Sequence, residues 1–324
     1  MGPLFGVVVA RALDRWWHEL RRPDPFVVVE AGAGSGTLAG AVLAARPECS
    51  AALRYVLVER SPRWRERQSA RLPLEPAGMV LGPMLVADSD LGPQPLAGIG
   101  PLVTALAELP VGPFEGVVLA NELLDNLPFR LLERAVGGRS WSEVRVTADL
   151  QECLVEAAEP LAAEADRLAP EAAPGARIPL QHAAAAWLRT ALAALARGRV
   201  VVVDYADTTS SMAARPWTDW LRTYRAHGRG GRPLDDLGHQ DVTCEVALDQ
   251  LAAVAPPAAD RTQADFLRLH GVDDVADAAG RLWQERAHIG DLEALKSRST
   301  VSEAAALTDP TGLGAFRVLE WVRA

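Results

Sequence analysis

Short runs of consecutive apolar residues, each closed by polar residues or glycine, recur along the chain. The Val-rich runs occupy Phe26–Glu30, Tyr55–Glu59, Gly116–Ala120 and Val200–Asp204. A continuous apolar run of this length is typical of a strand that is buried on both faces, as in parallel sheets. Polar residues and then a helical stretch follow each run, such as Thr37–Ala45 after the first. This order predicts an α/β fold with a mostly parallel sheet.

Other patterns predict helices and an insertion. Residues 9–22 form an amphipathic helical pattern that stops at Pro23. Phe129–Glu133 and Trp141–Thr147 alternate like strands on either side of the pair Gly137-Gly138. Because two glycines suit a tight turn, we expect an antiparallel hairpin inserted after the Gly116–Ala120 strand.

The second half of the chain is more varied. The composition of residues 157–176 predicts a loosely packed helix and loop. Ala183–Ala196 has a clear helical pattern and leads into the Val200 strand. Trp217, Trp220 and Tyr224 stand at i, i+3 and i+7, the spacing of a helical stripe that is more often core than pocket. Gly228–Gly238 predicts a mobile loop that could close over a substrate. Phe316–Val322 predicts a closing strand.

Composition narrows the class of protein. The chain has 324 residues, 49% hydrophobic and 23% charged, which suits one large or two modest globular domains. Its net charge of -9 argues against nucleic-acid binding, and we expect no segment to carry the surplus of positive charge that phosphate contacts require. Three cysteines far apart indicate neither zinc site nor disulfide framework, so a reduced cytoplasm is expected. The apolar run Pro3–Ala10 is too short to span a membrane and lacks a signal-peptide cleavage pattern.

The glycine loop after the first strand predicts a nucleoside cofactor. A dinucleotide site requires Gly-x-Gly-x-x-Gly, whereas here the spacing is Glu30-x-Gly32-x-Gly34-x-Gly36. NAD-dependent oxidoreductases are therefore disfavoured. The sequence resembles motif I of class I S-adenosyl-L-methionine (SAM) methyltransferases, in which the acid faces the amino-acid part of the cofactor. Glu59 closes the next strand, where a carboxylate can accept the two ribose hydroxyls. In the alternative without a cofactor, the three glycines form an ordinary tight turn, and Glu59 is a solvent-exposed residue at the end of a strand.

A polar turn follows the Gly116–Ala120 strand, at the carboxyl end of the strand, where open α/β sheets build their binding sites. If a helix begins near Asn121, then Glu122 and Asp125 share one face and lie near its positive end. Two carboxylates there could grip a cationic acceptor such as a guanidinium. We therefore assign Asn121, Glu122 and Asp125 as catalytic residues. In the alternative, Asn121 caps the helix and the acids only complement its dipole.

Five segments carry a family resemblance: "ANELLDNLP", "VVVEAGAGSGTLA", "VVVVDY", "DVTCEV" and "GLGAF". They are similar to the MidA family of SAM-dependent methyltransferases, related to the mitochondrial factor that methylates an arginine of a complex I subunit. The resemblance covers Gly2 to Trp321 and implies a Rossmann-like class I methyltransferase fold with inserted segments and a helical cap. It also implies an arginine-bearing protein acceptor. Family members generally carry a Phe-x-Thr-Ser element before the segment matching "GPLFG", whereas this chain begins at Met1. We expect that the start codon is misassigned, that the chain is truncated, or that cofactor binding is weakened.

Weaker patterns complete the predicted site. Asp204 and Tyr205 close the Val200 strand and resemble a pocket-lining pair, while His227 and Asp241 flank the glycine-rich loop. A metal site formed by His227, His239 and Asp241 is disfavoured because its spacing matches no known motif, so we expect no metal.

The functional prediction is a SAM-dependent methyltransferase acting on a protein arginine. A small-molecule methyltransferase, or a non-catalytic assembly protein of the same fold, would carry the same motifs. We expect a SAM-binding half at residues 1–135, an insertion at 136–180 and a second half at 181–324, with no nucleic-acid or membrane partner and with the oligomeric state open.

Overall fold

The computed structural model describes residues 2–82, 97–137, 140–225 and 228–324, which fold into two compact units. Unit 1 consists of Met1–Asn121, Ala191–Val203 and Pro257–Ala324. Unit 2 consists of Glu122–Thr190 and Asp204–Pro256. Each helix within the described residues is too short or too polar to cross a membrane.

A seven-stranded sheet forms the centre of unit 1, and its order is β15-β16-β9-β4-β1-β2-β3. Its strands are β1 (Phe26–Ala31), β2 (Leu53–Val58), β3 (Leu102–Leu106), β4 (Phe114–Asn121), β9 (Leu195–Asp204), β15 (Ala259–Thr262) and β16 (Arg317–Arg323). The pairs β1–β2, β1–β4, β2–β3 and β4–β9 are parallel, and β15 pairs antiparallel with β16. The predicted α/β class, the four Val-rich strands and the closing strand are confirmed. β3 and β15 were not foreseen.

Two glycines allow the central strands to approach one another. Gly116 of β4 lies in register with Val27 of β1 and with Gly198 of β9. A Cβ atom on Gly116 would lie 1.8 Å from the Val27 carbonyl oxygen, and one on Gly198 would lie 1.8 Å from the Gly116 carbonyl oxygen. No side chain fits at either position without moving a neighbouring backbone.

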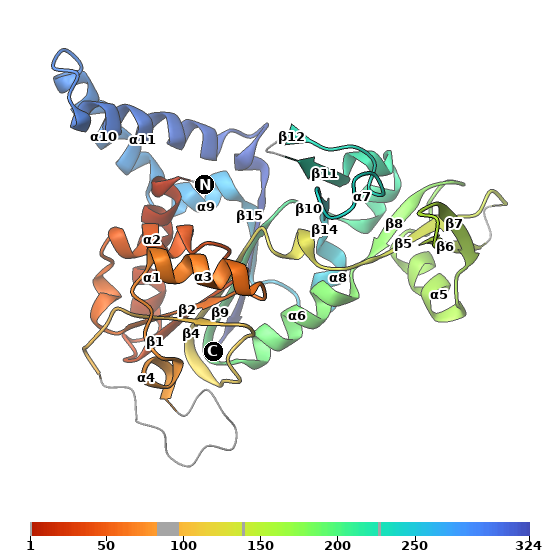
Figure 1. Cartoon of the computed structure of the whole chain (residues 1–324), viewed down its shortest axis with the longest axis horizontal. Coiled ribbons are helices and arrows are strands. Elements are labelled where there is room, and N and C mark those ends of the chain that lie inside the picture. The colour runs from red at the N-terminus through yellow and green to blue at the C-terminus, as the bar shows by residue number, and fades with distance from the viewer. Residues whose placement is uncertain (1, 83–96, 138–139, 226–227) are drawn as a thin grey trace. The chain divides into compact units, whose positions relative to one another are not determined.

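The helices of unit 1 include the predicted first two. They are α1 (Pro3–Glu19), α2 (Thr37–Ala44), α3 (Pro62–Arg71), α4 (Ala77–Leu81), α9 (Gln263–Leu269), α10 (Val272–Arg286) and α11 (Leu292–Thr308), with 3-10 turns η1 (Glu48–Ala51) and η5 (Leu313–Ala315). α1 begins at Pro3, six residues before the predicted start, because proline is well suited to the first helical turn. α10 and α11 pack side by side as a helical hairpin (Figure 1).

Unit 2 contains the predicted insertion. Its strands are β5 (Arg130–Arg134), β6 (Trp141–Val146), β7 (Glu152–Glu156), β8 (Arg177–Leu180), β10 (Ala206–Asp207), β11 (Leu221–Arg225), β12 (Gly228–Arg229), β13 (Asp241–Cys244) and β14 (Val246–Ala247). Its helices are α5 (Glu159–Leu168), α6 (His182–Ala193, which ends in unit 1), α7 (Thr209–Ala213) and α8 (Leu248–Ala252), with 3-10 turns η3 (Leu124–Asn126) and η4 (Trp217–Asp219). β5 and β6 pair antiparallel as predicted, and β7 and β8 extend them into a four-stranded sheet.

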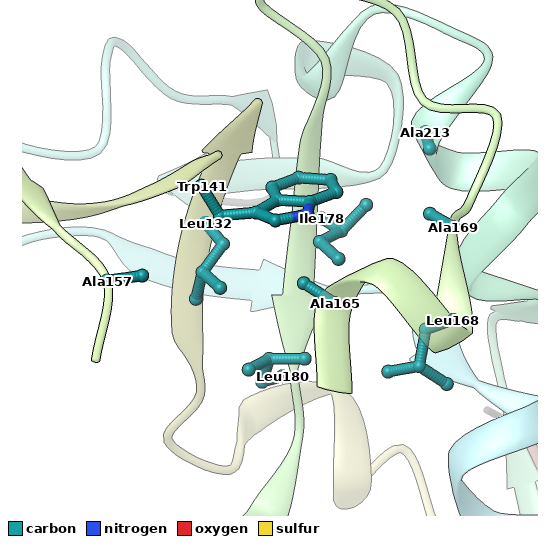
Figure 2. Packing of buried hydrophobic residues seen from close by; sticks show 9 residues of the cluster. All are labelled: Leu132, Trp141, Ala157, Ala165, Leu168, Ala169, Ile178, Leu180 and Ala213. Carbon is teal, nitrogen blue, oxygen red and sulfur yellow. The ribbon is translucent and has the colours of Figure 1, made fainter. Parts of the chain in front are cut away.

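An apolar cluster around Trp141 holds the inserted sheet to α5 (Figure 2). The Trp141 side chain is 1% exposed, and its indole Nε1 donates a hydrogen bond to Asp166 at 3.0 Å. Leu132, Ile178 and Leu180 from the neighbouring strands are fully buried against it. Burying side chains of this size stabilises the fold by about 1.5–3 kcal/mol each, so the insertion has a core of its own.

The helical stripe predicted for Trp217, Trp220 and Tyr224 is wrong. Pro216 precedes a single 3-10 turn, η4, and the chain continues as the strand β11, which contains Tyr224. The i, i+3, i+7 spacing fits a helix, but the backbone of β11 instead forms hydrogen bonds with β13 and is therefore extended. Trp220 is nonetheless fully buried, and Trp220 and Tyr224 both line a small pocket.

Candidate functional site

The glycine loop of unit 1 connects β1 to α2 by a turn that requires glycine. Gly32, Gly34 and Gly36 all have positive φ angles, of 73°, 50° and 75°. The amide of Gly32 donates to the carbonyl of Val58 at 2.9 Å, which fixes the loop against the end of β2. L-residues rarely adopt such φ values, so the three glycines permit this course of the backbone.

Glu59 lies directly after β2 and supports this loop. Its Oε2 accepts a hydrogen bond from the amide of Gly34 at 3.0 Å, and its Oε1 accepts one from the amide of Ser61 at 2.9 Å. The side chain is half-buried. A carboxylate offers about four acceptor positions, so these two contacts leave capacity for the predicted ribose hydroxyls.

Glu30, which the sequence predicts to face the cofactor, lies near the end of β1. Its side chain is buried within the sheet and accepts a hydrogen bond from the Tyr55 hydroxyl at 2.7 Å. Burial raises the pKa of Glu30 to about 7, against the opposing effect of hydrogen bonds from Tyr55 and the backbone of Ala39. These contacts suit a residue that holds the start of α2 beneath the loop, and a direct contact with cofactor stays a prediction.

The end of β4 adds a polar group to unit 1. Asn121 is the last residue of β4, and its side-chain Oδ1 is buried without a hydrogen-bond partner among the described residues. Such an acceptor is costly unless a ligand or water satisfies it. A Cβ atom on Gly34 would meet nothing within 4 Å, so the loop borders open space. The residues of unit 1 therefore fit a nucleoside cofactor.

One further residue of this region was missed from the sequence. Gln68 of α3 is fully buried, and its Nε2 donates to the carbonyl of Gly34 at 2.8 Å. The nearby Arg71 Nη1 donates to Thr37 Oγ1 at 2.8 Å. A lone uncharged amide within an arginine-rich helix was the available signal, and it was too weak to single out.

In unit 2, the turn that carries Glu122 and Asp125 is not the predicted helix. Glu122 has a φ of 51°, an uncommon left-handed conformation for a residue with a side chain. A single 3-10 turn, η3, follows, and Leu127 before Pro128 is extended. Proline disfavours helical geometry at the residue before it, so a longer helix cannot form here. The helix-dipole argument and the capping alternative for Asn121 both fail.

Asp204 organises this turn. Its Oδ2 accepts the amides of Leu124 at 3.0 Å and Asp125 at 3.2 Å, and its Oδ1 accepts the amide of Tyr205 at 2.9 Å. Its side chain is only 1% exposed. The structure therefore brings Asp204 and Asp125 together, and Asp204 anchors the backbone of the turn.

Burial and the charge of a neighbouring carboxylate shift both carboxyl groups. Desolvation and then the charge of Glu122 together raise the pKa of Asp125 to about 7, against a hydrogen bond from Asn126. Desolvation and then the charge of Asp125 hold the pKa of Asp204 well above its ordinary value. Neighbouring buried carboxyls of this kind retain protons near neutral pH and are frequent at functional sites.

A small pocket opens beside Asp125 within unit 2. Its lining residues are Asp125, Tyr205, Trp220, Arg222, Tyr224, Thr243, Cys244 and Glu245. In the structure it is too narrow to admit a water molecule, so a ligand would have to displace a side chain. Burial raises the pKa of Tyr205 to about 12, which keeps its hydroxyl protonated. Aromatic walls with carboxylates suit a cationic group.

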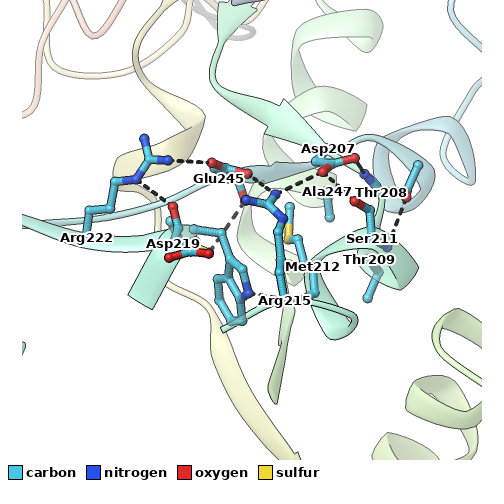
Figure 3. Close-up of polar contacts among 12 residues, drawn as sticks. Asp207, Thr208, Thr209, Ser211, Met212, Arg215, Asp219, Arg222, Glu245 and Ala247 are labelled. Carbon is cyan, nitrogen blue, oxygen red and sulfur yellow. Dashed lines mark hydrogen bonds and ion pairs between the residues drawn. The ribbon is translucent and has the colours of Figure 1, made fainter. Parts of the chain in front are cut away.

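Ion pairs connect Arg222 and Glu245, which line this pocket, to residues outside it (Figure 3). Glu245 accepts from Arg222 Nη2 at 3.0 Å and also from Arg215, which in turn pairs with Asp207 at 2.9 Å. The Arg222 guanidinium lies 5.8 Å from the centre of the Tyr205 ring. Cys244 and Glu245 belong to the quoted "DVTCEV" segment, yet the sequence did not mark them as site residues.

Asp241, the one of the two remaining predicted residues that the structure describes, is not brought into this pocket. Asp241 is an exposed residue of β13, opposite Tyr224 in register, and does not line it. His227 lies outside the described residues. Within the described part of the chain, no group of three or more His, Cys, Asp or Glu side chains is arranged to hold a metal ion.

Comparisons with known proteins agree with the fold and the cofactor. Residues 8–266 match a family described as "putative S-adenosyl-L-methionine-dependent methyltransferase". An uncharacterized protein from Burkholderia thailandensis is 27% identical, with a TM-score of 0.76 over 99% of this chain and 79% of its own. A second structure from that organism, a "likely methyl transferase" bound to S-adenosyl-homocysteine, is 26% identical, with a TM-score of 0.75 over 99% of this chain and 77% of its own. No curated protein matches the chain.

Proposed function

Since this chain belongs to that family of SAM-dependent methyltransferases, we propose that it transfers a methyl group from SAM to an arginine side chain of a protein. Its cofactor is SAM, as the sequence predicted. The observation that carries the proposal is the buried Asp125–Asp204 pair beside aromatic walls, in a chain of this family. The resemblance to the MidA family favours arginine over other acceptors.

We propose that unit 1 holds the cofactor. The loop at Gly32, Gly34 and Gly36 lets backbone approach it, Glu59 accepts its ribose hydroxyls and Asn121 Oδ1 gains a donor from it. SAM supplies an electrophilic methyl group. Glu30 keeps α2 in place through the hydrogen bond that it accepts from the backbone of Ala39, and a bond from Tyr55 of β2 fixes its side chain.

We propose that the turn of unit 2 handles the acceptor. A guanidinium is protonated at essentially all pH values, and it becomes a nucleophile only when carboxylates localise its charge and remove a proton. Asp125 has a pKa of about 7, so near neutral pH it is partly ionised and able to accept that proton. Glu122 adds a negative charge that strengthens the attraction for a cation. Asp204 positions Asp125 through the backbone of the turn.

A small-molecule acceptor is the second possibility, supported by how narrow the pocket is. An amine or guanidine metabolite would use the same carboxylates, whereas a neutral substrate would not need them. A non-catalytic assembly role would leave the buried carboxyl pair without a chemical purpose.

The experiment that tests the proposal separates binding from transfer. Calorimetric titration with SAM measures cofactor affinity, and release of S-adenosylhomocysteine with arginine peptides and their lysine counterparts measures transfer. We expect Glu122→Gln to lower transfer to arginine peptides at least about tenfold, with SAM affinity within about twofold. Parallel loss of SAM binding would place Glu122 at the cofactor, and SAM binding with no transfer to any peptide would favour the other two functions.

The remaining predictions stand as proposals. We propose that residues 1–135 bind the cofactor, that 136–180 form an insertion, and that 181–324 supply substrate-side elements. We also propose a cytoplasmic location, supported by three free cysteines, Cys49, Cys153 and Cys244. The loop Gly228–Gly238 remains a proposed lid, although Gln240 Nε2 ties it through the carbonyls of Arg232 and Asp235.

A further inference from the structure

Helix α3 of unit 1 presents an unusually basic surface. Between residues 60 and 71 the sequence has five arginines and one glutamate, a net charge of +4 in a chain of net charge -9. The rest of the chain therefore carries -13. This segment contradicts the expectation that no part of the sequence carries a surplus of cations. We call the exposed side chains of Arg60, Arg63, Trp64, Arg67 and Arg71 the α3 surface.

The α3 surface is exposed, and among its arginines it is Arg71 that makes a side-chain hydrogen bond within the described part of the fold, to Thr37. Arg63, Arg67 and Arg71 are exposed, and Trp64 is 40% exposed beneath the Arg67 guanidinium, 4.6 Å from its ring. Among described residues, no ion pair involves an arginine of this segment. Elsewhere, arginines such as Arg177 and Arg222 pair with carboxylates. A Trp–Arg stack with unpaired guanidinium edges is a typical anchor in protein interfaces.

Two contacts place this helix beside the cofactor loop. Gln68 on its buried side bonds the carbonyl of Gly34, and Arg71 bonds Thr37 at the start of α2. Anything that docks on α3 therefore lies next to the glycine loop. A docking surface at this place is able to hold a partner close to the methyl donor.

We propose that the α3 surface docks a short acidic segment of a protein partner. Carboxylates complement guanidinium groups by paired hydrogen bonds, and Trp64 offers an apolar anchor between them. A helix of ten residues is about 15 Å long, which suits a short segment. A long polyanion such as RNA would meet the net charge of -13 on the rest of the chain, so nucleic acid is disfavoured. That the segment belongs to the methyl acceptor rests on the proposed function, whereas the binding itself does not.

The test measures binding without cofactor, so that it fails or succeeds independently of methyl transfer. A short fluorescein-labelled oligoglutamate peptide is titrated with the full chain at low salt and followed by fluorescence anisotropy, with an oligolysine peptide as control. The variant Arg63→Glu with Arg67→Glu is compared with Arg281→Glu with Arg298→Glu on the helical hairpin. Arg298 also lies over a tryptophan, Trp283, at 5.6 Å, so the two double variants match in charge and in stacking.

We expect the α3 variant to weaken oligoglutamate binding about tenfold and the hairpin variant to change it by less than about twofold. Trp64→Ala should also weaken binding while thermal unfolding stays unchanged. Equal loss in both double variants, or no binding of oligoglutamate by the parent chain, would overturn the proposal. Tighter binding of single-stranded RNA than of oligoglutamate at equal ionic strength would overturn it in favour of a nucleic-acid partner.

Discussion

Replacing Glu59 with alanine gives the sharpest test of the cofactor site. The substitution removes one carboxylate that accepts the amides of Gly34 and Ser61, and that is predicted to accept two ribose hydroxyls. Hydrogen bonds to a charged acceptor contribute about 1.5–3 kcal/mol each, and water replaces part of this when the group is half-buried. We therefore expect a loss of about 2–4 kcal/mol of SAM binding free energy, at least about 30-fold in affinity.

Calorimetric titration with SAM measures this loss directly. Glu66→Ala removes an exposed carboxylate from α3 and is the matched control, which should leave affinity within about twofold. Circular dichroism and thermal unfolding establish that both variants fold. If Glu59→Ala binds SAM as tightly as the parent chain does, the assignment of Glu59 to the ribose is wrong.

Three further predictions concern buried groups. Because the pKa of Asp125 is about 7, methyl transfer should rise with pH through that value, and Glu122→Gln should move the midpoint of the pH–rate profile to lower pH. The raised pKa of Glu30 means that the native state holds a proton which the unfolded chain releases above about 4.5, so stability should fall by up to about 3 kcal/mol as pH rises from there to about 7. Urea unfolding near pH 5 and near pH 8 should show this fall in the parent and a smaller one in Glu30→Gln. Gly116→Ala should prevent folding, whereas Gly137→Ala, where a Cβ meets nothing within 4 Å, should leave the melting temperature unchanged.

The central sheet was predictable because its strands are buried on both faces. Such strands appear in the sequence as continuous Val-rich runs, and four of them are predictable from it. β3 and β15 were missed because both are only partly buried, and Asp260 and Arg261 interrupt the apolar pattern of β15. A strand at or near a sheet edge has fewer apolar neighbours to impose such a pattern.

The turn that carries Glu122 and Asp125 was predicted in composition but not in conformation. The sequence identified Asn121, Glu122 and Asp125, yet their spacing suggested a helix. Pro128 is a local signal against a longer helix, because it disfavours helical geometry at Leu127. The amides of Leu124 and Asp125, by contrast, are held by Asp204, about 80 residues away, and no local pattern indicates that contact.

The sequence also could not show that Asp204 holds a distant turn, and for that reason Asp204 was predicted to line the pocket. A carboxylate at the end of a central strand is as well placed to bind a substrate as to hold a neighbouring loop, and sequence cannot separate these roles. All three of its hydrogen bonds are to backbone amides, from Leu124, Asp125 and Tyr205. Because its carboxylate is occupied by these backbone amides, Asp204 can influence a methyl acceptor only through the turn that it holds. Asp204→Asn should therefore change the transfer rate, because the amide loses one acceptor oxygen for the backbone of the turn and so loosens Asp125.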